Sequence, residues 1–268
     1  MLLSPQQLND RLGSAGVLVV DVGDRSRYQK THIPGAVQLD YEVLVKREPP
    51  AMGLAPEPDC LARDLAAVGI SDDIEVVAYD SDGCGKASRL AWSLDWLGHP
   101  RHFILDGGLQ GWLESDLPVG REPTQPKPAY LDEQARAPHC LVDSQWVLQR
   151  LNDPEVVLLD CRTREEYTGE QSLAERGGHI PGAVHLDWAD LKDPEAAPAL
   201  RSEAELRAML AERGVTAEQD IVVYCQSHHR SSLMYVVLRT LGFAGVRAYA
   251  GSWSEWGNNP DLPVAVTE

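Results

Sequence analysis

The chain has 268 residues, of which 43% are hydrophobic and 24% are charged. This balance excludes a disordered, collagen-like or coiled-coil protein, and the length suits two domains of ordinary size. The formal net charge of −17 excludes bulk electrostatic binding to nucleic acid or to an anionic membrane.

Read in chain order, the first half of the sequence is followed by a second copy of itself. The hexapeptide HIPGAV occurs at residues 32–37 and again at 179–184. The other blocks recur in the same order: 17–21 as 156–160, 76–79 as 221–224, the Gly-x4-Trp segment 107–112 as 251–256, and 117–119 as 262–264. Such repetition predicts two copies of one domain. The second copy has extra length at residues 170–176.

A stretch rich in proline separates the two copies. Prolines recur between Gly120 and Pro138 among charged and polar residues, which predicts an exposed linker. We therefore expect one domain over residues 1–119, a linker over 120–140, and a second domain over 141–268.

Within the second copy, short apolar runs alternate with amphipathic stretches. The capping box that begins at Ser202 opens a helix to about residue 213, and Gly242 ends another. The expected strands are 156–159, 184–186, 221–224 and 246–249, and the expected helices also include 231–241 and 252–256. Apolar strands separated by helices predict an α/β fold in which each domain is a parallel sheet flanked by helices on both faces.

One strand end carries groups suited to chemistry. The run 221–224 leads into Cys225, and a short loop then enters a helix. The backbone N–H groups of such a loop converge on an anion and favour the reactive thiolate. The candidate catalytic residue is Cys225, and the candidate substrate-binding residues are Gln226, Ser227, His228, His229, Arg230 and Ser231.

The first copy provides an internal control. Asp80 stands where Cys225 stands, and the loop that follows holds Asp82 but no arginine or histidine. We therefore expect the first copy to be non-catalytic, with Cys84 as a second thiol of minor interest. Residues 221–254 lack any acidic residue, which predicts a locally basic pocket around Cys225.

These motifs together resemble the rhodanese family in its tandem-domain form. The resemblance rests on both HIPGA segments, Asp160-x-Arg162 with Tyr167, the Cys-x4-Arg loop and the Gly-x4-Trp element. It implies a five-stranded parallel sheet per domain and an active cysteine in the second one. The loop sequence Cys-Gln-Ser-His-His-Arg resembles a bacterial subgroup. Glu166 departs from the family pattern, which commonly has arginine there, so the substrate clamp must differ.

The resemblance implies a thiosulfate sulfurtransferase. The Cys225 thiolate takes the sulfane sulfur of thiosulfate, and the persulfide passes it to cyanide, a small thiol or a thioredoxin-like protein. No metal and no cofactor are expected. The principal alternative is a 3-mercaptopyruvate sulfurtransferase, which shares the persulfide but has a less basic loop. A phosphatase of the same fold would need Cys-x5-Arg, and a non-enzymatic binding module would not need Cys225.

Other residues near the motifs receive structural interpretations. Asp160 and Arg162 are expected to form a supporting ion pair near the site, His179 to be structural, and Cys161 to be inert. Trp188, Trp253 and Trp256 are expected in the core or at an interface.

The cysteines and the termini bear on the compartment. The five cysteines form no C-x-x-C pair, which argues against a disulfide framework or a zinc site. No signal-peptide pattern and no run of about 18 apolar residues is present. We expect a cytoplasmic monomer that contacts neither membrane nor nucleic acid.

Overall fold

The computed structural model describes residues 1–81, 83–132, 137–196 and 198–266, and it divides the chain into two compact units. Unit 1 consists of Met1–Leu44, Pro56–Pro138 and Asp193–Leu200. Unit 2 consists of Val45–Ala55, His139–Lys192 and Arg201–Glu268. The domain boundaries at residues 119 and 141 remain predictions from the repeat. Two short segments, 45–55 and 193–200, belong to the unit that the other half of the chain mainly forms.

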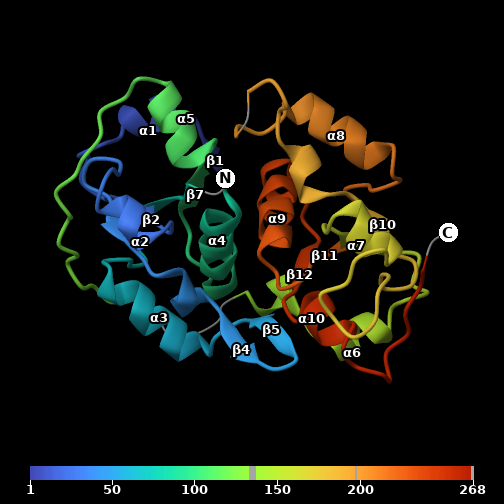
Figure 1. Cartoon of the computed structure of the whole chain (residues 1–268). Helices are drawn as coiled ribbons and strands as arrows, with labels where there is room; N and C mark the ends of the chain where they lie inside the picture. Colours follow the sequence, from blue (N-terminus) through green and yellow to red (C-terminus); the bar gives the residue numbers. More distant parts are fainter. Residues whose placement is uncertain (82, 133–136, 197, 267–268) are drawn as a thin grey trace. The chain divides into compact units, whose positions relative to one another are not determined.

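Unit 1 is built around a parallel five-stranded sheet with the order β1-β7-β6-β2-β3 (Figure 1). Its strands are β1 (Leu2–Leu3), β2 (Val17–Asp21), β3 (Val37–Gln38), β6 (Glu75–Tyr79) and β7 (His102–Leu105). Its helices are α1 (Pro5–Asn9), α2 (Arg25–Tyr28), η1 (Tyr41–Leu44), α3 (Pro58–Ala67), α4 (Gly85–Leu97) and α5 (Gly108–Glu114).

Unit 2 repeats this sheet, with the order β10-β9-β11-β12-β8 and all pairs parallel. Its sheet strands are β8 (Leu141–Val142), β9 (Val156–Asp160), β10 (Val184–His185), β11 (Asp220–Tyr224) and β12 (Val246–Tyr249). Its helices are α6 (Ser144–Leu148), α7 (Arg164–Thr168), η3 (Trp188–Leu191), α8 (Glu203–Ala211), α9 (Arg230–Thr240) and α10 (Ser252–Trp256), and η2 (Pro138–Cys140) stands at the join.

The expected α/β architecture is confirmed in both units. The four strands and three helices predicted for the second copy are all present within a few residues of their expected ends. The capping box at Ser202 forms, because its hydroxyl accepts from Glu205 N–H while the Glu205 carboxylate accepts from Ser202 N–H. The first turn of α7 uses the same device, with Thr163 and Glu166. The sequence analysis did not anticipate β8, α6 or α7.

The repeated HIPGA histidines have the same structural role in both units. The His32 ring stacks on Tyr28 with centroids 4.2 Å apart, and its Nδ1 lies 2.7 Å from the Tyr28 carbonyl oxygen. The His179 ring stacks on Tyr167 at 3.8 Å, with Nδ1 2.9 Å from the Tyr167 carbonyl oxygen. Because unit 1, which has Asp80 in place of Cys225, makes the same contacts, they belong to the scaffold that both units share.

A hairpin encoded in the first half of the chain belongs to unit 2. It consists of β4 (Lys46–Glu48) and β5 (Ala51–Leu54), which pair antiparallel, and β5 packs against α10. Figure 1 shows β5 beside α10. Conversely, residues 193–200 from the second half belong to unit 1, where Leu200 N–H donates to Asp106 Oδ1 at 2.9 Å.

The linker is less exposed than the sequence predicts. Most of its described residues are exposed, but Leu131 is 2% exposed. Thr124 N–H donates to the Tyr28 hydroxyl at 3.0 Å, and Ala129 N–H donates to the Ala66 carbonyl at 2.9 Å. The apolar Leu131 side chain and these hydrogen bonds hold the segment against unit 1. Residues 133–136 of the linker lie outside the described part.

The described residues contain no helix long and apolar enough to cross a membrane. All five cysteines are described, and no disulfide joins any two of them.

Candidate active site

The candidate nucleophile lies where β11 ends and α9 begins. Cys225 is only 1% exposed, and its carbonyl accepts from Trp253 N–H at 2.9 Å. Ser254 N–H donates to the next carbonyl, that of Gln226, also at 2.9 Å. The first residues of α10 therefore hold the backbone of the loop, which explains why the Gly-x4-Trp element accompanies it.

Several donors converge on the Cys225 sulfur. The Ser231 hydroxyl donates to Sγ at 3.4 Å, and backbone N–H groups of Ser227 and Ser231 also point to it. Burial opposes ionisation, but the Arg230 guanidinium and these donors together hold the pKa of Cys225 below its usual value. The loop therefore favours a thiolate, which is the nucleophilic form of cysteine.

His228 is turned into the protein. It is fully buried, and its Nδ1 lies 2.8 Å from the Ser231 hydroxyl oxygen. Its backbone has φ of 52°, in the left-handed region that few residues other than glycine adopt. The Ser232 hydroxyl donates to the His228 carbonyl at 2.6 Å and so secures this conformation.

Arg230 forms an ion pair that the sequence analysis did not foresee. Its Nη1 and Nη2 lie 2.5 and 2.8 Å from the two carboxylate oxygens of Glu166, and both side chains are largely buried. Burial opposes the charge on Glu166, but the hydrogen bonds and charge of Arg230 hold the pKa of Glu166 below its usual value. Glu166, the residue that departs from the family pattern, is therefore the ion-pair partner of Arg230.

This pair corrects the expectation of a locally basic pocket. Arg230 is paired with Glu166, and Arg247 with Asp220 at 3.1 Å. Both carboxylates come from outside the acid-free segment, so the fold neutralises charges that appear unbalanced in the linear sequence.

The expected ion pair between Asp160 and Arg162 is present and buried. Arg162 Nη2 lies 2.6 Å from Asp160 Oδ2 and also donates to the Gly178 carbonyl at 2.7 Å. The guanidinium lies 4.3 Å from the centroid of the Trp253 ring. Trp253 and Trp256 are fully buried, as expected for core residues, whereas Trp188 is half-buried. The Cys161 thiol is also fully buried, and burial raises its pKa.

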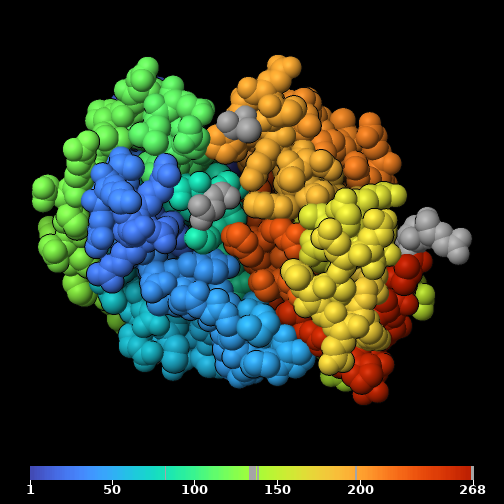
Figure 2. All heavy atoms as spheres, viewed as in Figure 1, coloured from blue at the N-terminus to red at the C-terminus, as the bar shows by residue number. Residues whose placement is uncertain are grey.

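The remaining loop residues lie toward the surface of unit 2. Gln226 Nε2 donates to the Leu173 carbonyl at 3.4 Å, and the His229 ring lies 6.1 Å from the Trp188 ring. A hollow of about 550 Å³ adjoins the loop; it is lined by Thr163, Glu166, Gln171, Ser172, Leu173 and Arg230. Figure 2 shows the yellow-coloured segment that contains part of this lining at the surface. The extra residues 170–176 of the second copy thus border the hollow.

Comparison with known proteins agrees with this geometry. The family model for the rhodanese-like domain matches residues 4–115 and 143–259. The chain belongs to the rhodanese family. It is 38% identical over 99% of its length to the thiosulfate sulfurtransferase of Azotobacter vinelandii, covering 97% of that protein. It is 36% identical, with the same coverage of both chains, to the thiosulfate sulfurtransferase of Pseudomonas aeruginosa.

Rhodanese relatives with other names also match. They include the 3-mercaptopyruvate sulfurtransferase of Escherichia coli, which is 32% identical over 97% of this chain and 91% of that protein. The anaerobic ergothioneine biosynthesis enzyme from Chlorobium limicola superposes with a TM-score of 0.90 at 21% identity, covering 100% of this chain and 70% of the other. At that identity, the likeness concerns the fold alone.

The first rhodanese unit has the same loop with a different occupant. The Asp80 carboxylate is fully buried; its Oδ1 accepts from Cys84 N–H and its Oδ2 from Ala87 N–H, both at 2.8 Å. Cys84 is buried as well, with Sγ 3.5 Å from the Leu105 carbonyl oxygen. Asp82 lies outside the described residues. The Asp80 carboxylate therefore accepts backbone N–H groups from its own loop and from the first turn of α4.

The hairpin of unit 2 adds residues that the sequence analysis missed. Met52 N–H donates to the Ser254 hydroxyl oxygen at 3.0 Å. A Cβ atom at Gly53 would overlap the Ser227 carbonyl, so only glycine lets β5 approach the loop this closely. No pattern in the sequence pairs residues 51–54 with residues 225–227; the glycine inside a short strand is the one local signal of a close backbone approach.

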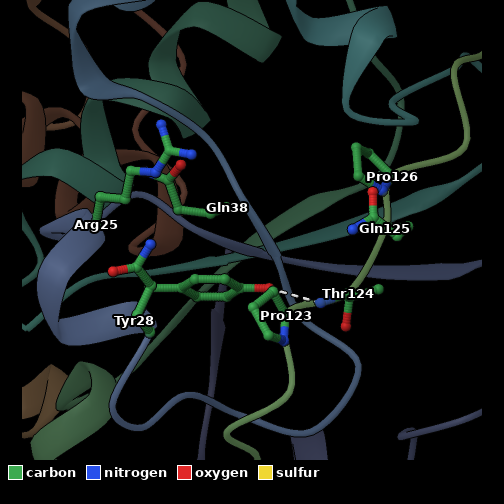
Figure 3. Close-up of a pocket in the computed structure, with 8 residues that line it drawn as sticks. Arg25, Tyr28, Gln38, Pro123, Thr124, Gln125 and Pro126 are labelled. Atoms are coloured by element: carbon green, nitrogen blue, oxygen red, sulfur yellow. Dashed lines mark hydrogen bonds between the residues drawn. The ribbon is translucent and has the colours of Figure 1, made fainter.

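A separate hollow in unit 1 does not involve the loop residues. It has a volume of about 230 Å³ and is lined by Arg25, Tyr28, Gln29, Gln38, Pro123, Thr124, Gln125 and Pro126. Figure 3 shows the linker residues passing beside Tyr28, with the hydrogen bond from Thr124. Among the residues that the structure describes, no group of histidine, cysteine or acidic side chains is arranged to hold a metal ion.

Proposed function

We propose that the chain is a thiosulfate sulfurtransferase that carries sulfur as a persulfide on Cys225. The observation that carries this proposal is the set of donors around the Cys225 sulfur, which lowers the pKa of the thiol despite its burial. The names of two full-length relatives support thiosulfate as the donor. Their identities to this chain exceed that of the 3-mercaptopyruvate enzyme.

The reaction divides into two sulfur transfers. In the first, the Cys225 thiolate attacks the sulfane sulfur; the new S–S bond forms as the bond to the sulfonate breaks, and sulfite leaves with the electron pair. The persulfide then carries the negative charge on its outer sulfur. In the second, cyanide or a thiol attacks that sulfur, and the thiolate is restored. The two steps balance without an oxidant, a metal or another cofactor.

The loop supplies the groups that would stabilise the transferred charge. The N–H groups of Ser227 and Ser231 and the Ser231 hydroxyl already point at the sulfur. We assign Arg230 to the electrostatic support of the thiolate, with Glu166 holding its orientation. We propose that Gln226 and His229, two partly exposed residues of the loop, contact the donor or the acceptor. Asp160 and Arg162 support the site from the buried side.

The rest of the proposal concerns context. The first unit is non-catalytic, because a carboxylate occupies its loop and no thiol stands at that position. The protein acts as a cytoplasmic monomer, with a small thiol or a thioredoxin-like protein as acceptor in the cell. The acidic composition argues against nucleic acid as a partner.

Intact mass spectrometry of the full chain tests the proposal. After exposure to thiosulfate the protein should gain one sulfur atom, and cyanide should remove it and release thiocyanate. The Cys225→Ser variant should gain nothing, while Cys161→Ser should behave as the wild type. Sulfur on the Cys225→Ser protein would overturn the assignment. Loading rates with thiosulfate and with 3-mercaptopyruvate, compared at equal concentration, decide which donor is preferred.

A further inference from the structure

A continuous hydrogen-bonded chain links a buried histidine to the candidate nucleophile. His228 Nδ1 lies 2.8 Å from Ser231 Oγ, and Ser231 Oγ donates to Cys225 Sγ at 3.4 Å. All three side chains are buried, with exposures of 0 to 1%. When Cys225 is a thiolate, His228 Nδ1–H donates to the Ser231 hydroxyl oxygen, and the Ser231 hydroxyl donates to the sulfur. The tautomer of His228 thus controls which way the Ser231 hydrogen points.

The backbone holds this arrangement in place. A histidine with positive φ is uncommon, and the conformation turns the His228 side chain inward, toward the first turn of α9. The Ser232 hydroxyl, bonded to the His228 carbonyl, opposes relaxation to an ordinary loop conformation. The left-handed conformation of His228 costs free energy, which the surrounding contacts must offset. Such strain at a candidate site points to a function of the strained residue.

The first unit lacks every member of the chain. At the positions that match Cys225, His228 and Ser231, it has Asp80, Gly83 and Lys86. The Asp80 carboxylate accepts from the N–H of Cys84 in its loop and from the N–H of Ala87 in the first turn of α4. The histidine and the serine therefore accompany the thiol, whereas the loop backbone alone supports the carboxylate.

We propose that His228 is a positioning residue that acts on Cys225 through Ser231 and receives the thiol proton when Cys225 ionises. The proton moves from Sγ to the Ser231 oxygen as the Ser231 hydrogen passes to His228 Nδ1. The products are a thiolate and an imidazolium, and no proton is gained or lost overall. The inference rests on the proposed function in that Cys225 is taken as the nucleophile.

Other charged and titratable groups act on the same sulfur. Arg230 stabilises the thiolate from the first turn of α9, whereas Cys161, which follows β9, is close enough for the charge of the Cys225 thiolate to raise its pKa. A test must therefore separate the contribution of His228 from that of Arg230. Variants that leave Arg230 and Glu166 unchanged meet this requirement.

The test is the pH dependence of Cys225 alkylation by iodoacetamide in the full chain. Variants His228→Asn and Ser231→Ala should each shift the midpoint of the alkylation profile upward by about one pH unit. They should therefore react up to about tenfold more slowly below the wild-type midpoint and reach the wild-type rate at high pH. Asparagine tolerates positive φ and retains a donor at the place of Nδ1, but it cannot take the proton. The conservative variant Ser231→Thr should restore most of the rate.

A double variant provides the decisive comparison. If His228 acts through Ser231, adding His228→Asn to Ser231→Ala should change the rate no further. Additive effects, or an unchanged profile in His228→Asn, would overturn the proposal. The matched control is His179→Asn, which removes a structural histidine of the same unit and should leave the alkylation profile unchanged. Because alkylation needs no sulfur donor, failure of persulfide formation would count against the proposed function and not against this coupling.

Discussion

The loops after β6 and β11 share a backbone design but hold different anions. In unit 1, N–H groups of the loop and of the helix that follows bond to the Asp80 carboxylate, and in unit 2, N–H groups of Ser227 and Ser231 point at the Cys225 sulfur. The carbonyls of Asp80 and Cys225 also accept equivalent bonds, from Leu109 and Trp253 N–H, each at 2.9 Å. In both units, therefore, the fold places backbone N–H groups at a strand end, where they can stabilise an anion. The side chains decide whether it is reactive.

The scaffold behind the two loops is also repeated. In unit 1 the Tyr79 hydroxyl joins Asp21 to the Ile33 N–H, and in unit 2 the Tyr224 hydroxyl joins Asp160 to the Ile180 N–H. The two units therefore share this hydrogen-bonded arrangement behind the loop, whichever residue follows the strand. Arg162 differs, since the corresponding residue of unit 1 is Gly23, and its guanidinium is present in unit 2 alone of these two positions.

The largest effect is expected when Cys225 of unit 2 is replaced by aspartate, the residue at the matching position 80 of unit 1. In Cys225→Asp the new carboxylate should accept the loop N–H groups as Asp80 does, so the protein should fold. Thiosulfate:cyanide sulfurtransferase activity should fall at least about 10³-fold, since the nucleophile is lost. Steady-state kinetics and urea unfolding check the two halves of this prediction.

The reciprocal change serves as its control. Asp80→Cys, made in the Cys225→Ser background, places a thiol at the same strand end without counterparts of Arg230, His228 and Ser231. No sulfur should be gained from thiosulfate. Persulfide formation there would mean that the backbone alone makes the site reactive.

A second substitution measures how much the Asp80 carboxylate stabilises unit 1. Asp80→Ala leaves the buried N–H groups of Cys84 and Ala87 without their acceptor, and the free energy of unfolding should fall by about 2–4 kcal/mol. Chemical denaturation measures the loss, and sulfur loading at Cys225 should persist. The conservative Asp80→Asn should lose less, because one amide oxygen remains. Equal stability of Asp80→Ala and wild type would show that the carboxylate is dispensable.

The smallest expected effect concerns the Glu166–Arg230 ion pair of unit 2, whose matching positions in unit 1 are Arg27 and Gly85. The pKa of Glu166 is lowered in the folded state, so its stabilisation is fully present above the unfolded pKa of about 4.3 and is lost as pH falls through the folded value. Glu166→Gln should lower the free energy of unfolding by about 1 kcal/mol at pH 7 and by less at pH 3. Denaturation at both pH values checks this; a difference that grows on acidification would contradict it.

Much of the fold is predictable because each segment of one copy can be compared with the matching segment of the other copy. Strands buried on both faces read as apolar runs, and the capping box at Ser202 has a local signature that the structure confirms. The position of Cys225 follows from the strand–loop–helix pattern, and the Asp160–Arg162 pair from the spacing of two residues.

The remaining features depend on contacts distant in the sequence. Glu166 and Arg230 are 64 residues apart, so the acid-free segment looked basic although its arginine is paired. The inward turn of His228 depends on a backbone conformation that no residue type announces, since adjacent histidines in a loop look alike. The expected exposure of the linker failed at Leu131 because composition describes a segment and not each side chain.

The hairpin that contacts the Cys225 loop has a consequence for any division of the chain into two halves. A fragment starting at residue 141 would carry Cys225 but not Met52 or Gly53, which meet Ser254 and Ser227 in the intact chain. Likewise, residues 193–200 from the second half of the chain belong to unit 1, as residues 45–55 from the first half belong to unit 2. A cut between the two copies would therefore separate each unit from a segment that the other half of the chain encodes.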